Sequence, residues 1–110
     1  MLDDHQLLAR YVGDGSEAAF CELVERYVDL VYSAALRRTG GDTHLAHDVA
    51  QLVFTDLARK ARSIPKNVVL AGWLHRATRF AAAQLLRTEC RRQSREQEAA
   101  EMSSNGSRLC

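Results

Sequence analysis

One long amphipathic segment constrains the fold of this chain more than any other feature. Between Ser16 and Gly40-Gly41, apolar residues recur every three or four positions, the spacing that gives an α-helix one continuous apolar face. Ser16 is a good N-cap, and the arginines at 37 and 38 suit the last turn, where cations are favoured. The predicted apolar face comprises Phe20, Leu23, Val24, Tyr27, Val31, Ala34 and Ala35. Cys21 is predicted to be a small core residue beside them.

The segments before and after this helix are also predicted to be helical. A short helix ends at Gly13-Asp14-Gly15 and takes Asp3 or Asp4 as its cap. A third helix begins after Gly40-Gly41, with Asp42 or Thr43 as its cap, and its apolar residues run from Leu45 to Ala61. The prediction is therefore three helices before the only proline in the chain.

The remaining segments follow from Pro65, which disfavours helical geometry at the residue before it. Residues 62–71 are predicted to form the longest loop, and a basic helix follows that ends near Gln97. The polar residues 98–110 are expected to be a disordered tail. Because no alternating strand-like run is present, the predicted fold is all-α: a small antiparallel bundle of about four helices in one domain, residues 1–97.

The total charge of +1 conceals an uneven distribution. Residues 1–58 hold four basic and ten acidic side chains, whereas residues 59–95 hold ten basic and one acidic. Two surfaces of opposite charge favour two different partners. The N-terminal MLDDHQ is acidic where a secretory signal would be basic and then apolar, so we expect a cytoplasmic protein without a membrane anchor.

The stretch from Gly72 to Arg95 carries most of the positive charge. It reads GWLHRATRFAAAQLLRTECRRQSR and combines six arginines and one carboxylate with the aromatics Trp73 and Phe80. Clustered cations attract a polyanion, and aromatic rings can stack on exposed bases. Trp73 is open between core packing and stacking, and Phe80 is open between inward packing and stacking. The stretch predicts a nucleic-acid-binding helix.

Three segments in this order resemble region 2 of bacterial RNA polymerase sigma factors. They are the EAAFCELVERYVDLVYSAALRRTGG helix, the LAHDVAQLVF helix and the GWLHRATR basic helix. Within that superfamily the chain is most similar to the extracytoplasmic-function (ECF) group, over roughly residues 5–97. The resemblance implies a transcription initiation factor that docks on core polymerase and recognises and melts the promoter −10 element. An anti-sigma factor is a further partner by family analogy.

The resemblance assigns roles to residues of three segments. The third helix would dock on the clamp coiled coil of the largest polymerase subunit through Asp48, Gln51, Leu52, Thr55 and Asp56. Bases of the non-template strand would be read by Lys66, Asn67, Val68, Trp73, His75, Arg76 and Arg79. Phosphates of the upstream duplex would be contacted by Arg87, Arg91, Arg92 and Arg95.

The sequence departs from the family pattern in two places. Many members have Asn where this chain has Phe80, which puts a polar base contact there in doubt. Sigma factors of this group also continue into a helix-turn-helix domain, region 4, that reads the −35 element, whereas only the polar tail follows residue 97 here. Both a fragment and a stand-alone region 2 are consistent with this sequence.

Two alternative functions stay open on the residues. A helical interaction module could bind a protein through its acidic face while the basic helix stays idle. An HD-type metal-dependent phosphohydrolase would use His44, His47 and Asp48, but only His5 and Asp56 are available as further ligands. The sequence holds no GxSxG, no glycine-rich phosphate loop and no CxxC pair, so we predict no catalytic residue, no metal site and no cofactor.

Overall fold

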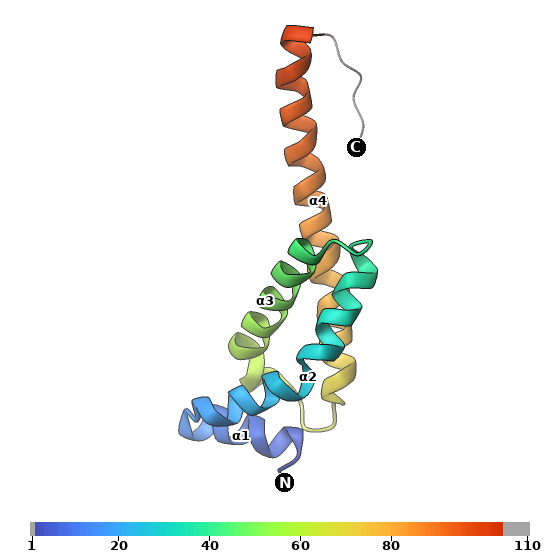
Figure 1. Cartoon of the computed structure of the whole chain (residues 1–110). Helices are drawn as coiled ribbons and strands as arrows, with labels where there is room; N and C mark the ends of the chain where they lie inside the picture. The colour runs from blue at the N-terminus through green and yellow to red at the C-terminus, as the bar shows by residue number, and fades with distance from the viewer. Residues whose placement is uncertain (1, 105–110) are drawn as a thin grey trace.

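A computed structural model describes residues 2–104 of the chain, with side chains for residues 2–100. These residues form α1 (Asp4–Asp14), α2 (Glu17–Arg38), α3 (Thr43–Lys60), a 3₁₀ turn η1 (Ala61–Ser63) and α4 (Leu70–Ser104). In Figure 1, α2, α3 and the first half of α4 pack together, α1 lies across one end of them, and the rest of α4 projects beyond the bundle. The prediction of an all-α bundle is confirmed.

The predicted N-caps hold the starts of the first three helices. The Asp3 side chain accepts from the Gln6 amide at 2.8 Å, and Asp42 accepts from the Leu45 amide at 3.0 Å. At the start of α2, the Ser16 hydroxyl accepts from the Ala19 amide, as predicted. Gly15 adopts φ 67° between α1 and α2, a left-handed conformation that favours glycine. Local sequence therefore sets where these helices begin.

The core forms where α2, α3 and α4 meet. Every residue of the predicted apolar face of α2 is buried or half-buried, which confirms the helical period. Leu23 and Val31 of α2 contribute fully buried side chains, as do Val53 and Leu57 of α3 and Leu74 of α4. Cys21 is exposed, so its predicted place in the core was wrong. It lies two residues from both buried Ala19 and buried Leu23, which turns it to the opposite side of the helix.

The start and end of α4 differ from the sequence prediction. The helix begins at Leu70, whose side chain is only 1% exposed, so the loop spans residues 64–69 rather than 62–71. It continues past Gln97 to Ser104, and the predicted tail beyond it, residues 105–110, lies outside the described residues. Neither α4 nor any other helix within residues 2–104 is long and apolar enough to cross a membrane.

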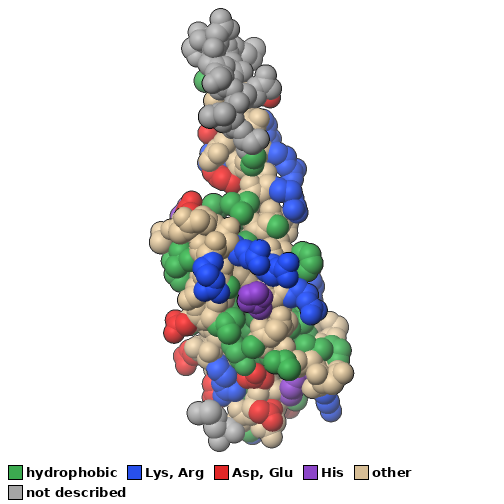
Figure 2. All heavy atoms as spheres, turned by 90° about the vertical axis from the view of Figure 1, so that its right-hand side faces the viewer, with side chains coloured by type: hydrophobic (Ala, Val, Ile, Leu, Met, Phe, Trp, Pro, Cys, Tyr) green, Lys and Arg blue, Asp and Glu red, His purple; other side chains and the backbone are tan. Residues whose placement is uncertain are grey.

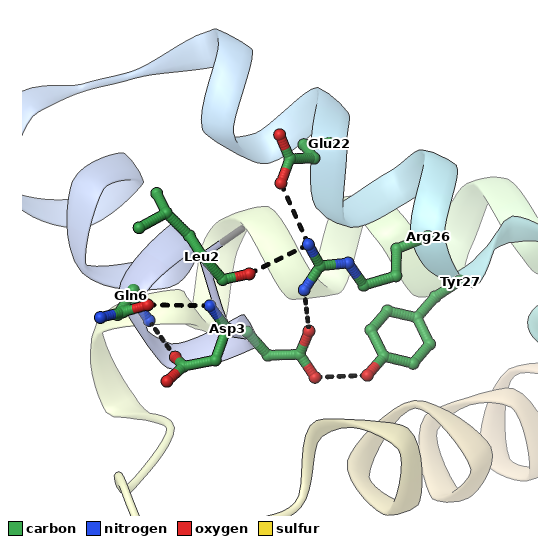
Figure 3. A network of polar contacts seen from close by, with 7 residues as sticks. Leu2, Asp3, Gln6, Glu22, Arg26 and Tyr27 are labelled. Carbon is green, nitrogen blue, oxygen red and sulfur yellow. Dashed lines mark hydrogen bonds and ion pairs between the residues drawn. The ribbon is translucent and has the colours of Figure 1, made fainter.

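A network of charged side chains fastens α1 to α2 (Figure 3). Asp4 accepts from the Arg26 guanidinium at 2.9 Å and also from the Tyr27 hydroxyl. Arg26 reaches Glu22 and donates to the Leu2 carbonyl, both at 3.0 Å. Arg26 and Asp4 are only partly exposed, so their ion pair is less screened than an open surface pair. The start of α1 is therefore fixed against the side of α2.

The stability of the fold should depend on pH through Tyr27. Partial burial, together with its hydrogen bond to the charged Asp4, raises the pKa of Tyr27 to about 12. The folded state thus keeps a proton that an unfolded tyrosine loses near pH 10. The stabilisation is complete below pH 10 and is lost as the pH rises through 12. We expect the free energy of unfolding to fall over that range in urea titrations, and Tyr27→Phe to remove much of the fall. An equal fall in the variant would contradict the assignment.

Candidate nucleic-acid interface

The predicted base-reading residues of α4 lie on two neighbouring faces of the helix. Arg76 lines a groove between α3 and α4. His75 and Arg79 are exposed and lie one turn apart, and Arg79 is also one turn from Arg76. The three positions therefore span about 100° around the helix axis, and a nucleic acid lying along this side of α4 can contact all of them.

The groove between α3 and α4 has a volume of about 480 Å³. Trp73 packs partly against the core and also lines this groove, so both of its predicted roles are sterically available. Phe80 lines the same groove and is 71% exposed, which rules out the inward packing that the sequence left open. The remaining lining residues are Leu52, Asp56, Arg59, Lys60, Arg76, Ala77, Ala81 and Gln84. The groove thus combines two aromatic rings with three cations and one carboxylate.

The predicted docking residues form a ridge along α3 between two hollows. Leu52 and Asp56 line the groove toward α4, and Asp56 is paired with Arg59 at 3.7 Å. Gln51 and Thr55 line a second hollow, which α3 shares with α2. Asp48 is half-buried, one turn before Leu52 on the same ridge. The predicted polymerase and DNA surfaces therefore meet at the groove between α3 and α4.

The loop of residues 64–69 lies against α1. Lys66 lines a hollow of about 280 Å³ whose other walls come from α1 and η1, among them His5, Leu8, Val12 and Arg62. Asn67 is exposed, and Val68 is half-buried with its carbonyl accepting from His5 Nε2 at 2.8 Å. The three predicted loop residues therefore differ: only Lys66 borders the hollow, Asn67 is exposed at the loop surface, and Val68 is bonded to α1.

The four arginines predicted to contact phosphates are not equivalent. Arg92 donates to Glu89 and to Glu96, the latter at 2.6 Å, and its hydrogen bond holds the pKa of Glu89 below the usual value. Within the described residues, Arg87, Arg91 and Arg95 make no ion pair with a carboxylate. They are spaced by four residues and therefore lie along one side of the helix. These three arginines, which we call the arginine stripe, are available to an external anion.

The separation of charge is visible on the molecular surface. In Figure 2, Lys and Arg side chains gather across the middle of one face and continue along the projecting part of α4, with hydrophobic side chains between them. Asp and Glu side chains lie mainly toward the margins and the lower end of that face. A continuous basic surface with apolar side chains within it is the pattern that binds a nucleic-acid backbone and its bases.

The family of the chain follows from a model match. The family model described as Sigma-70 region 2 matches residues 23–96, which spans most of α2, all of α3, the loop and most of α4. The chain belongs to the sigma-70 region 2 family. Membership indicates a non-enzymatic sigma-factor role in promoter recognition, with RNA polymerase and promoter DNA as partners in general. No curated protein and no solved structure matched the chain significantly.

The match to region 2 begins after α1. His5 and Asp4, which tie α1 to the loop and to α2, therefore lie outside the matched residues. Among the residues that the structure describes, no three His, Cys, Asp or Glu side chains come together as metal ligands would. Within this part of the chain, the His44, His47 and Asp48 of the phosphohydrolase alternative therefore do not form a metal-binding cluster.

Sequence reasoning about the region 2 chain missed two features of the site. The pairing of Arg92 could have been found, because Glu89 and Glu96 stand three and four residues away, the spacing at which helical charges meet. The contact of His5 with Val68 joins residues 63 positions apart and leaves no local signal. The first is a matter of counting along a helix, whereas the second requires the tertiary fold.

Proposed function

We propose that this region 2 domain docks on the clamp coiled coil of the largest RNA polymerase subunit and recognises and melts the promoter −10 element. In this proposal the ridge on α3 binds polymerase, and the loop with the start of α4 reads the non-template strand. The arginine stripe holds the upstream duplex. The domain would act in the cytoplasm as part of an ECF-type sigma factor.

One observation carries the DNA half of the proposal. Lys66 and Arg62 border a hollow, and the exposed Asn67 follows Lys66 directly in the loop. Asn67 stands three residues before Leu70, where the basic helix α4 begins with His75, Arg76 and Arg79 in its first three turns. A base removed from its stack needs a recess that can receive it, next to groups that bind the backbone. Cations bind the phosphates, and an amide can read a base edge.

The energetics of melting are consistent with this arrangement. Unstacking and unpairing one base costs a few kcal/mol, and stacking on an aromatic side chain returns about 1–3 kcal/mol. Trp73 and Phe80 both line the groove beside Arg76, so ring surface and positive charge are available in one place. The loop and the groove together offer more than one site for a flipped base.

The polymerase half of the proposal rests on the shape and charge of α3. The ridge carries two carboxylates, Asp48 and Asp56, around the exposed Leu52, and a hollow lies on each side of it. Complementary charge would steer a basic partner helix to this ridge and fix its register, while Leu52 would supply apolar contact.

Selection from a randomised single-stranded DNA pool tests the proposed function. With core polymerase present, the chain is expected to enrich a short consensus sequence and to bind it in preference to the complementary strand. Binding should weaken steeply as salt rises, because several phosphates are contacted. Flat salt dependence without an enriched sequence would instead favour a protein-interaction module with an idle basic helix.

Asn67→Ala should reduce the reading of one base. Loss of an amide that contacts a base edge typically removes about 1–3 kcal/mol of discrimination, so the preference at one position of the consensus is expected to fall at least about fivefold. Competition binding with single-base substitutions measures this. Gln93→Ala removes a similar amide from the projecting part of α4 and should leave every position unchanged. Equal behaviour of the two variants would remove Asn67 from the proposed site.

A further inference from the structure

The hydrogen bond between α1 and the loop has a defined direction. His5 Nε2 lies 2.8 Å from the Val68 carbonyl oxygen in a partly buried setting. A carbonyl only accepts, so Nε2 carries the hydrogen and donates it. The amide of Val68 donates to the Pro65 carbonyl at 3.1 Å and closes a turn within the loop. Both backbone polar groups of Val68 are therefore hydrogen-bonded, the carbonyl to His5 and the amide to Pro65.

Within the described part of the chain, this is the one hydrogen bond that ties residues 64–69 to an element distant in sequence. The other bonds of this segment are local: Ile64 to Ala61, Val68 to Pro65 and Trp73 to Val69. Short connections with few buried contacts open readily unless they are tied down. The loop therefore depends on α1 for a fixed conformation.

The residue beside His5 anchors α1 in turn. Asp4 is bound by Arg26 and Tyr27 of α2, and Arg26 also holds the Leu2 carbonyl. Two consecutive residues of α1 thus face two different elements, one bonded to α2 and one bonded to the loop. The helix α1 links the rigid bundle to the loop through this pair.

We infer that His5 is a positioning residue for base recognition: it fixes the loop so that Lys66 and Asn67 face a flipped base, and this inference rests on the proposed function of the loop. His5 also lines the hollow that Lys66 borders, so the same side chain sets both the loop conformation and one wall of the site. The specificity of the domain then depends on α1, which lies outside the family match.

Two substitutions of His5 separate its hydrogen bond from its packing. His5→Phe keeps a ring and removes the donor, whereas His5→Gln keeps an N–H donor at a similar reach. In native-state hydrogen exchange, His5→Phe is expected to speed exchange of the Val68 amide about 2- to 10-fold, the loss that one hydrogen bond produces. Exchange in the centres of α2 and α3 should not change, and His5→Gln should restore the wild-type rate.

DNA binding supplies the functional readout for the same variants. The preference for the enriched single strand over a scrambled strand should fall several-fold in His5→Phe and recover in His5→Gln. The salt dependence should stay as in wild type, because the arginine stripe is untouched. Far-UV circular dichroism checks that both variants retain the helical bundle, as we expect.

Each contrary outcome has a distinct meaning. Unchanged exchange at Val68 in His5→Phe would overturn the inference, and so would faster exchange with undiminished base preference. If His5→Gln does not restore the exchange rate and the base preference that His5→Phe loses, the effect belongs to the ring and not to the hydrogen bond. That result would also overturn the inference. If wild type itself shows no base preference, the proposed function of the loop fails, a result that is distinguishable because it does not involve His5.

Discussion

Replacing Arg87, Arg91 and Arg95 together with alanine is expected to flatten the salt dependence of DNA binding. Each phosphate contact contributes about 0.9 to the slope of log affinity against log salt, so the slope should fall by about 3. Between 50 and 200 mM salt, wild type should then lose about 40-fold more affinity than the triple variant. Fluorescence anisotropy with a promoter duplex, with core polymerase present, measures both slopes.

Arg92→Ala is the matched control for the arginine stripe. Arg92 is on the same helix and is equally a cation, but Glu89 and Glu96 already neutralise it. We therefore expect its replacement to leave the slope nearly unchanged. If the slope of log affinity against log salt falls as much for Arg92→Ala as for Arg91→Ala, then Arg92 contacts a phosphate despite its ion pairs. The stripe would then comprise all four arginines that the sequence predicted.

Asp48→Arg should sharply reduce recovery of core polymerase in a pull-down. The substitution reverses charge on the ridge of α3, next to Leu52, where the proposed partner is a basic helical coil. Like charges placed opposite each other in an interface cost several kcal/mol, and each 1.4 kcal/mol is a tenfold change in affinity. We expect recovery to fall at least tenfold at polymerase concentrations near the dissociation constant.

Asp14→Arg provides the control for charge reversal. It makes the same change in net charge at the end of α1, where a cation is favoured by the helix dipole. Recovery of polymerase should remain at the wild-type level. Equal recovery with Asp48→Arg and wild type would reject the docking surface on α3 while leaving the DNA predictions intact, because those depend on α4 and the loop.

The fold was predictable where local chemistry decides it. The caps at Asp3, Ser16 and Asp42 and the apolar period of α2 all act within a few residues, and each was confirmed. The start of α4 was less predictable, because Gly72, a poor helix former, lies in its first turn. Burial of Leu70 against the other helices outweighs that weak local preference and draws the residue into the helix.

The candidate site was only partly predictable from its residues. The residue types on α3 and α4 indicated acidic and basic surfaces, but not that Leu52 and Asp56 share a groove with Arg76 and Phe80. The crossing of two helices brings these side chains together, and no spacing along one helix encodes it. The roles of these residues in binding stay predictions that the variants above test.

The continuity of α4 has a geometric consequence for promoter binding. From Leu70 to Arg95 the helix is unbroken, and at 1.5 Å per residue it spans about 38 Å, which is close to one turn of duplex DNA. In the proposed complex, α4 would therefore set the distance between the loop and the last arginine of the stripe. Insertion of one residue at its middle would lengthen it by only about 1.5 Å but would rotate the stripe by about 100°. The length of α4 therefore fixes the relative orientation of the loop and the arginine stripe around the helix axis more strictly than it fixes the distance between them.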